Sequence, residues 1–427
     1  MDIVIAGAGI GGLTAALSLH AAGFDHIEIL EAAPRIEPLG VGVNLLPNAV
    51  RELDELGLLD ELASRAVATR DLLYYNRYGQ RVWGEPRGRA AGHQWPQLSI
   101  HRGELHSTLA AAVTARIGRD AITTGRRVTG FTELPSGRIR IHTRHVDGQT
   151  GYTDTDLLIG ADGIGSAIRR TLYPHEGPPL SNELIMWRGT AWTTPFLTGA
   201  SMIVAGDDIQ RLVLYPIRHH AGAEHPALVN WVIARPDPHS GQRRGHETRT
   251  APVTRVLRHA QYWQFDWLDI PAIIAATDTV LEYPMVDREP LPQWSFGTVT
   301  LLGDAAHPMY PAGSNGATQA IIDARTLAHH LAATNDPHEA LRAYDHHRRP
   351  TLARIQTSNR TMGPERAITL AHQRAPHGFT NIHDIIAEQE LTQIITDYAT
   401  LIGLDSEPCS HPARTTGPHR ENTTDTK

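Results

Sequence analysis

The sequence predicts an α/β fold in which a domain with a parallel sheet is interleaved with a second domain on an antiparallel sheet, followed by a helical C-terminal part. A strand, a glycine-rich turn and a helix succeed one another at the N-terminus. Strands rich in Trp, Tyr and Val dominate residues 183–288, and helical spacing returns in residues 361–404. The 427 residues are enough for two domains, because single cores rarely grow beyond about 250–300 residues.

The first 31 residues follow a fixed order of patterns. Ile3 to Ile5 is an apolar, β-branched run typical of a buried parallel strand. The motif Gly7-x-Gly9-x-x-Gly12 comes next and leads into an Ala/Leu-rich helical stretch. A second apolar run, Ile27 to Leu30, ends at the acidic Glu31. This order predicts a Rossmann-like unit that binds a dinucleotide.

Each residue type in this unit has a physical role. Gly7 permits the tight turn, Gly9 lets a pyrophosphate approach the backbone, and Gly12 lets the helix lie close on the strand. The start of the helix offers free N–H groups to the phosphates. Glu31 is placed to accept hydrogen bonds from a ribose diol. The alternative is a glycine-rich turn without a ligand.

Two further segments of the first domain contain candidate binding residues. Gly40 and Gly42 punctuate a loop before a helical stretch, which favours an approach of the Gly42 and Val43 backbone to a cofactor ring. An ordinary loop is the alternative. Arg102 stands just before the next helical stretch, where a guanidinium can hold a phosphate or a ribityl chain. The alternative for Arg102 is a surface salt bridge with Glu104 or Asp71.

Two later strand–turn–helix patterns carry an acidic residue at the turn. The first ends in Gly160-Ala-Asp162-Gly163 and continues into a helix with Arg169. The second runs from Gly303-Asp304 through a proline-stiffened loop to a helix that starts at Asn315-Gly316. We interpret Asp304 as an acceptor for a polyol chain, and the helix start as facing the electron-rich end of a flavin. The alternative is that Asp304 only caps a helix.

Composition excludes several mechanisms. Cysteine occurs only at Cys409, so no intrachain disulfide or redox dithiol can form. Lysine occurs only at the terminal Lys427, which excludes a Schiff-base or P-loop lysine. The 25 histidines show no metal-ligand spacing, so we expect no metal site. A net charge of −7, no membrane-length apolar run and no signal peptide predict a cytoplasmic protein without nucleic-acid or membrane partners.

The antiparallel domain supplies the candidates for substrate binding. Its strands bring aromatic and aliphatic side chains to the sheet, and we expect a planar aromatic ligand there. Tyr215 is a weak candidate for proton transfer, with half-buried packing as the alternative. Arg188 could face a substrate carboxylate or form a surface pair. The full set of expected substrate-binding residues is Trp187, Arg188, Tyr215, Trp231, Tyr283 and Met285.

The same patterns set the expected domain boundaries. We assign residues 1–74, 100–182 and 289–360 to the cofactor domain and residues 75–99 and 183–288 to the substrate domain. C-terminal helices occupy 361–404. The polar, Pro- and Thr-containing residues 405–427 predict a disordered tail.

Together, the glycine motif with Glu31, the Asp162-Gly163 turn and the Gly303-Asp304-Ala-Ala-His-Pro stretch resemble the FAD-dependent class A aromatic hydroxylases, which have the p-hydroxybenzoate hydroxylase-like fold. The resemblance runs from residue 1 to about residue 360. Stretches such as Met186-Trp-Arg-Gly are similar to the phenazine-modifying members, which hydroxylate with loss of a carboxyl group. Similarity to these members is weaker after residue 361.

The resemblance implies a single-component monooxygenase of secondary metabolism. It would use FAD, NAD(P)H (with NADH favoured) and O2 to hydroxylate a planar aromatic such as a phenazine carboxylic acid through a flavin C4a-hydroperoxide. We expect a monomer or homodimer. The residues that the resemblance implies for FAD binding are Gly7, Gly9, Gly12, Glu31, Ala32, Val43, Arg102, Val128, Asp162, Arg169, Asp304, Pro311, Gly313, Asn315 and Gly316.

Two other functions remain open at this point. One is a different flavin oxidoreductase of the same fold, such as an epoxidase or an oxidase-type tailoring enzyme. A flavin halogenase is disfavoured, because the chain offers no lysine near the substrate and Trp263-Gln-Phe-Asp-Trp267 has the wrong spacing for the halogenase motif. The other is a flavin-binding regulator without turnover, which substrate-stimulated NADH oxidation would distinguish from an enzyme.

Overall fold

The three predicted strand–turn motifs lie side by side in one six-stranded sheet. In this computed structural model the strand order is β19-β20-β12-β1-β2-β8. All neighbours are parallel except the β19–β20 pair. The carboxyl ends of β1, β12 and β20 therefore meet at one edge, which is where open α/β sheets bind ligands. The strand bounds are β1 Ile3–Ala6, β2 Ile27–Leu30, β8 Ile122–Thr123, β12 Leu157–Gly160, β19 Ser295–Phe296 and β20 Val299–Leu301.

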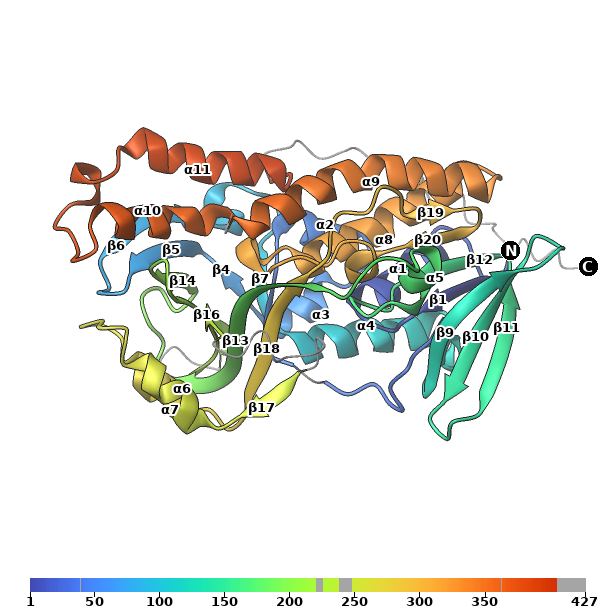
Figure 1. Cartoon of the computed structure of the whole chain (residues 1–427), viewed down its shortest axis with the longest axis horizontal. Helices are drawn as coiled ribbons and strands as arrows, with labels where there is room; N and C mark the ends of the chain where they lie inside the picture. Colours follow the sequence, from blue (N-terminus) through green and yellow to red (C-terminus); the bar gives the residue numbers. More distant parts are fainter. Residues whose placement is uncertain (39, 220–225, 238–247, 362, 405–427) are drawn as a thin grey trace, which may run out of the picture.

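The structure describes residues 1–38, 40–219, 226–237, 248–361 and 363–404, so the predicted tail at 405–427 lies outside the described residues. Helices cover the parallel sheet. α1 (Ile10–Ala21) packs against α4 (Arg102–Arg116) and α8 (Gly316–Ala333), and α8 packs against α9 (Pro337–Arg360). The three-stranded sheet β9 (Arg126–Glu133), β10 (Ile139–His145) and β11 (Thr150–Thr155) contacts α5 (Ala167–Leu172) and forms one end of the molecule in Figure 1.

The second domain is an eight-stranded sheet with the order β17-β18-β13-β16-β15-β14-β5-β6. It is antiparallel except where β14 pairs with β5 in parallel. Side chains of alternate residues point to opposite faces, and one face packs on α6 (Val253–Ala260) and α7 (Ile270–Ala275) in a core of its own. The strand bounds are β5 Asp71–Asn76, β6 Arg81–Pro86, β13 Leu180–Thr193, β14 Ser201–Gly206, β15 Arg211–His219, β16 Ala227–Pro236, β17 Arg249–Ala251 and β18 Val280–Asp287.

A short sheet and the C-terminal helices join the two domains. β3 (Gly42–Leu45) and β4 (Ala66–Thr69) flank β7 (Gln97–His101). α10 (Arg366–Arg374) and α11 (Glu388–Leu401) lie over β5 and β6 in Figure 1, with α10 in contact with both strands. Their apolar faces share a core with β5, β14 and β15. Two expected domain boundaries, after residues 74 and 99, fall inside β5 and β7. Each of these strands belongs to one sheet over its whole length, so the sheets themselves do not change at these positions.

Candidate active site

One cavity of about 430 Å³ runs from the edge of the parallel sheet onto the eight-stranded sheet. Its walls come from the β1–α1 turn, β3, the turn after β12, the loop between β20 and α8, one face of the eight-stranded sheet and the C-terminal segment. Segments from the whole length of the chain thus meet at one place. The expected cofactor residues that line this cavity are Gly9, Val43, Arg102, Asp304, Pro311, Gly313, Asn315 and Gly316.

The glycine-rich turn has the geometry that a pyrophosphate requires. Gly7 has φ +101°, and a Cβ there would lie 2.5 Å from the Ala161 carbonyl oxygen. A Cβ on Gly12 would lie 2.0 Å from the Gly7 carbonyl oxygen, so the helix can approach the strand only because this residue is glycine. A Cβ on Gly9 would meet nothing within 4 Å. Gly9 also begins α1 without a side-chain cap, so the helix start faces open space beside the cavity.

Glu31 lies at the end of β2 and joins that strand to the glycine turn. Its carboxylate accepts hydrogen bonds from the Ala8 N–H at 2.8 Å and the Ala33 N–H at 2.7 Å. Glu31 and the adjacent Ala32 are partly exposed and lie outside the residues that line the cavity. Val128 is buried in the main core on β9, away from the cavity lining. The cofactor roles of these residues stay predictions.

Asp304 follows β20, and its accessible side chain lines the cavity together with Arg102. Partial desolvation by the surrounding protein raises the pKa of the Asp304 carboxyl, and His307 and Arg102 partly oppose this rise. Arg169 does not line the cavity; its guanidinium donates to the carbonyls of Ala305 at 3.1 Å and Ala306 at 2.9 Å. Arg169 therefore positions the Asp304 loop.

Asp162 caps a helix and also keeps one oxygen free. Its Oδ2 accepts from the Ala167 N–H at 2.7 Å, at the start of α5. Its Oδ1 is buried and has no hydrogen-bond partner among the described residues. Burial raises the pKa of this carboxyl. Because the neighbouring Gly163 lines the cavity, the free oxygen fits a hydroxyl of a bound cofactor.

The loop before α8 is held in an unusual backbone conformation. Gly313 and Ser314 have φ of +67° and +57°, which is the left-handed region. The Asn315 side chain donates to the Tyr398 hydroxyl at 2.9 Å and makes no cap hydrogen bond to α8. The first N–H groups of α8 therefore stay available, and Gly316 lines the cavity. A helix start of this kind stabilises a neighbouring negative charge.

A buried ionic network supports this loop from behind. Asp323 on α8 contacts His307 Nε2 at 2.5 Å and Arg348 Nε at 2.7 Å, and it accepts from the Gly303 N–H at 3.2 Å. Burial alone would raise the pKa of Asp323, but the neighbouring His307 and Arg348 outweigh burial and lower the pKa. The sequence offered one signal for this network, because His307 belongs to the Asp304-Ala-Ala-His-Pro stretch.

Alternation along the strands decides which predicted substrate residues face the cavity. Arg188, Tyr215 and Met285 line it. Trp187 and Trp231 do not: they point to the opposite face, where their indole N–H groups donate to Glu282 and Thr277, both at 2.8 Å. The expectation that these two tryptophans contact substrate is therefore corrected, because a one-residue step along a strand reverses the side-chain direction.

Tyr283, Arg188 and Tyr215 differ in their surroundings. Tyr283 pairs with Met186 and shares the cavity face of the sheet, but it lies outside the cavity lining. Arg188 donates from Nη2 to the Gly42 carbonyl at 2.8 Å. Burial raises the pKa of Tyr215 to about 12, so its phenol is protonated at neutral pH and is a hydrogen-bond donor rather than a base.

Several cavity residues carried no recognisable sequence signal. Arg211 on β15, Glu365 before α10 and Tyr398 on α11 line the half of the cavity formed by the second sheet and the C-terminal segment. Burial raises the pKa of Glu365 to about 7, opposed in part by Arg211. Among the described residues, one group of three ligand-type side chains has its ligand atoms within 4.8 Å of one another, namely Asp207, Asp208 and His372, and none of these lines the cavity.

This architecture defines an FAD-dependent aromatic monooxygenase with the p-hydroxybenzoate hydroxylase-like fold, as the sequence predicted. Residues 1–358 match the family model described as FAD binding domain, and the chain belongs to that family. No helix in the described ranges is long and apolar enough to cross a membrane.

Individual relatives are similar to this chain over most of its length. The chain is 46% identical over 372 residues to the phenazine 1,6-dicarboxylic acid hydroxylase PhzS of Lysobacter antibioticus, covering 86% of this chain and 91% of that protein. It is 31% identical to a 3-hydroxybenzoate 6-hydroxylase of Polaromonas naphthalenivorans, covering 85% and 87% of the two chains. The fold is shared with Klebsiella pneumoniae HpxO complexed with FAD and uric acid, with a TM-score of 0.71, 22% identity and coverage of 94% and 92%.

Proposed function

We propose that this enzyme hydroxylates phenazine carboxylic acids, with NADH as the reductant and O2 as the oxygen source. One observation carries the proposal: the cavity that begins at the glycine-rich turn continues without a break onto the apolar face of the eight-stranded sheet. A cofactor and a flat aromatic ligand can therefore lie end to end. The 46% identity to a phenazine 1,6-dicarboxylic acid hydroxylase supports the choice of substrate class.

The cofactor half of the cavity suits FAD at several points. We propose that the pyrophosphate lies against Gly9 at the start of α1, that Asp304 accepts from the ribityl hydroxyls, and that the isoalloxazine lies between Val43 and the Pro311–Gly316 loop. Bound FAD supplies the redox chemistry, in which a hydride is accepted and O2 is activated. The uncapped N–H groups at the start of α8 would stabilise negative charge on a flavin bound beside them.

The substrate half of the cavity positions the substrate and excludes water from it. Its walls are aliphatic and sulfur-containing side chains of the sheet, which suit a planar polycyclic ring. Tyr215, which keeps its proton, can donate a hydrogen bond to a ring substituent or ring nitrogen. The aliphatic and sulfur-containing side chains at this face are Leu72, Met186, Met202, Val204, Val213, Val232, Ala234 and Met285.

The test is the oxidation of NADH by the FAD-loaded protein with and without phenazine-1,6-dicarboxylic acid. We expect stimulation and a product that gains one oxygen atom, and its mass also reports whether a carboxyl group is lost. NADPH in place of NADH tests the reductant, and 3-hydroxybenzoate is the single-ring control. Preferential stimulation by 3-hydroxybenzoate, or peroxide as the only product with every phenazine acid, would contradict the proposed substrate class.

A further inference from the structure

The glycine-rich turn between β1 and α1 is oriented in part by β2. The Gly7 N–H donates to the Leu30 carbonyl at 2.8 Å. The Ala8 N–H donates to Oε2 of Glu31, just after β2, at 2.8 Å. Because a peptide group is planar and rigid, a hydrogen bond at one end restricts the direction of both its N–H and its C=O. β2 and Glu31 thus orient the first two peptide planes of the turn.

The third peptide plane, between Ala8 and Gly9, is held by a side chain of α4. Nε2 of His106 lies 2.6 Å from the Ala8 carbonyl oxygen, and no other described residue donates to this oxygen. Because a carbonyl oxygen only accepts, His106 is the donor, through an Nε2–H. Ala8 is buried, so His106 takes the place that water would have at an exposed turn.

This contact sets the direction of the next N–H group. The C=O and N–H of a trans peptide point in opposite directions, so the Gly9 N–H is directed away from His106. Gly9 lines the cavity, and its N–H has no acceptor among the described residues. The Gly9 N–H is therefore a free donor at the start of α1, where a phosphate oxygen fits.

The helix that carries His106 also reaches the cavity. α4 packs beside α1 (Figure 1). His106 follows Arg102 by four residues, which places both side chains on one face of α4. Because Arg102 lines the cavity, this face supplies a cation to the cavity and, one turn further on, a donor to the glycine-rich turn.

We propose that His106 is a positioning residue for the cofactor: by holding the Ala8 carbonyl, it directs the Gly9 N–H toward the FAD pyrophosphate. This proposal rests on the placement of the pyrophosphate at Gly9 under the proposed function, and it adds the side chain that keeps Gly9 in its binding orientation. Without a donor at position 106 the Ala8–Gly9 peptide is free to rotate, because Gly9 has no side chain and even a Cβ there would meet nothing within 4 Å.

The experiment measures the dissociation constant of FAD by quenching of flavin fluorescence on titration of the apoprotein. His106→Leu removes the donor and keeps a similar volume, whereas His106→Gln keeps an amide N–H at a similar reach. We expect FAD to bind about three- to tenfold more weakly to His106→Leu, the usual effect of losing one hydrogen bond, and within about twofold to His106→Gln. If urea unfolding shows that the leucine variant is not folded, His106→Asn, whose amide is too short to reach Ala8, takes its place. Equal affinities of the donor and non-donor variants would overturn the proposal.

Fragments of the cofactor show whether the loss arises at the pyrophosphate. ADP carries the pyrophosphate without the flavin, so as a competitor it should lose affinity for His106→Leu by the same factor as FAD. Riboflavin carries no phosphate and should bind both proteins equally. A loss for FAD without a loss for ADP, or an equal loss for riboflavin, would mean a general loosening of the domain and would refute the positioning role.

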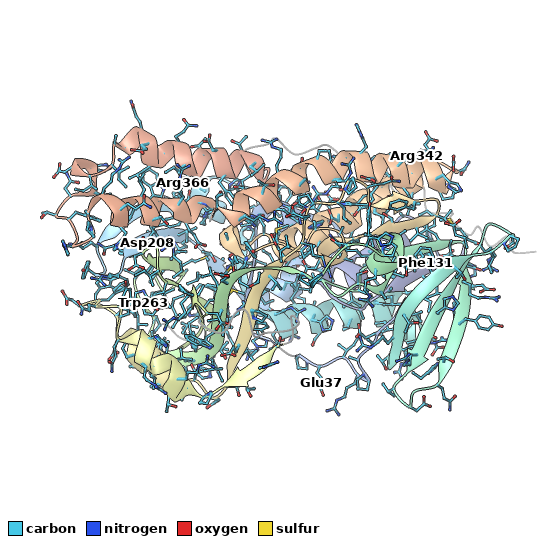
Figure 2. The ribbon with its side chains drawn as sticks, viewed as in Figure 1. Glu37, Phe131, Asp208, Trp263, Arg342 and Arg366 are labelled. Carbon is cyan, nitrogen blue, oxygen red and sulfur yellow. The ribbon has the colours of Figure 1, made fainter. Side chains whose placement is uncertain are left out.

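His142→Leu is the matched control. Its Nε2 lies 3.3 Å from the Thr132 hydroxyl, on the three-stranded sheet that carries Phe131, labelled in Figure 2, and outside the cavity lining. This variant should bind FAD within about twofold of the unaltered protein. If it weakens FAD binding as much as His106→Leu does, the effect does not arise at the glycine-rich turn and the proposal falls.

Gly9→Ala separates this proposal from the placement on which it rests. If Gly9→Ala leaves the FAD affinity unchanged, the placement of the pyrophosphate at Gly9 fails, and the role of His106 fails with it. If Gly9→Ala weakens FAD binding and His106→Leu does not, the placement stands and only the role of His106 is refuted. Losses for both variants, with recovery in His106→Gln, are the expected result.

Discussion

Replacing Tyr398 by phenylalanine tests whether the C-terminal helices hold the flavin-side loop in place. The buried Tyr398 hydroxyl accepts from Asn315 Nδ2 at 2.9 Å, and its single proton can be donated to Asn359 Oδ1 at 2.8 Å or to the Ala312 carbonyl at 3.1 Å. Tyr398→Phe removes one accepted and one donated hydrogen bond. Asn315 keeps a second contact, to the Gly313 carbonyl at 3.3 Å, whereas Asn359 Oδ1 loses its donor.

We expect the free energy of unfolding to fall by about 2–3 kcal/mol, from about 1 kcal/mol for the accepted bond and about 1–2 kcal/mol for the acceptor left unsatisfied. Because Ala312 and Asn315 line the cavity, the same loss should weaken FAD binding by up to about 30- to 140-fold, since about 1.4 kcal/mol corresponds to a factor of ten. Urea unfolding of the apoprotein and titration with FAD measure the two quantities. Tyr173→Phe is the matched control, because its hydroxyl donates to the Gln293 carbonyl at 2.7 Å, away from the cavity lining. A Tyr398 variant with the FAD affinity of the unaltered protein would refute the reasoning.

Three further predictions follow from the cavity. Gly12→Ala should prevent normal folding or lower the free energy of unfolding by at least about 2 kcal/mol, because the methyl group would lie 2.0 Å from the Gly7 carbonyl oxygen. Gly9→Ala should fold normally and bind FAD weakly. Thermal unfolding and the flavin content of the two variants test this contrast. Asp304→Ala should retain its circular dichroism spectrum and lose FAD, and an unchanged flavin absorbance would count against its ribityl role. The pKa of Glu365 is about 7 in the folded protein and 4.5 for the free group. Its favourable contribution to the free energy of folding is therefore present below pH 4.5 and is lost as the pH rises through 7. Glu365→Gln should therefore gain up to about 3 kcal/mol relative to the unaltered protein between pH 5 and pH 8, at about 1.36 kcal/mol per pKa unit, and parallel stability curves would contradict the assignment.

Several of the expected cofactor residues line the cavity, because the motifs that predicted them stand next to strand ends and helix starts. Gly9, Asp304 and the Pro311–Gly316 loop all follow strands of one parallel sheet or precede a helix, and such positions can be read from local order alone. The family and fold expected from these motifs are confirmed.

The substrate half was harder to predict for two physical reasons. The sequence does not show toward which face of a sheet an aromatic side chain points. Trp187 and Trp231 could therefore not be assigned to the core of the second domain without the strand register. Arg211, Glu365 and Tyr398 lie on separate elements far apart along the chain, and they meet only through the docking of α10 and α11 on the sheet. No local pattern reports such a contact.

The C-terminal segment forms a wall of the cavity that is separate from the cofactor motifs. The family model ends at residue 358, and Pro364, Glu365, Tyr398 and Ile402 complete the cavity from beyond that point. Substitutions confined to this wall therefore change the shape of the cavity without altering the glycine-rich turn or Asp304. Tyr398 limits which substitutions the wall tolerates, because the helix that carries it also holds the flavin-side loop. A transplanted C-terminal segment would have to bring both its pocket residues and a hydroxyl at this position.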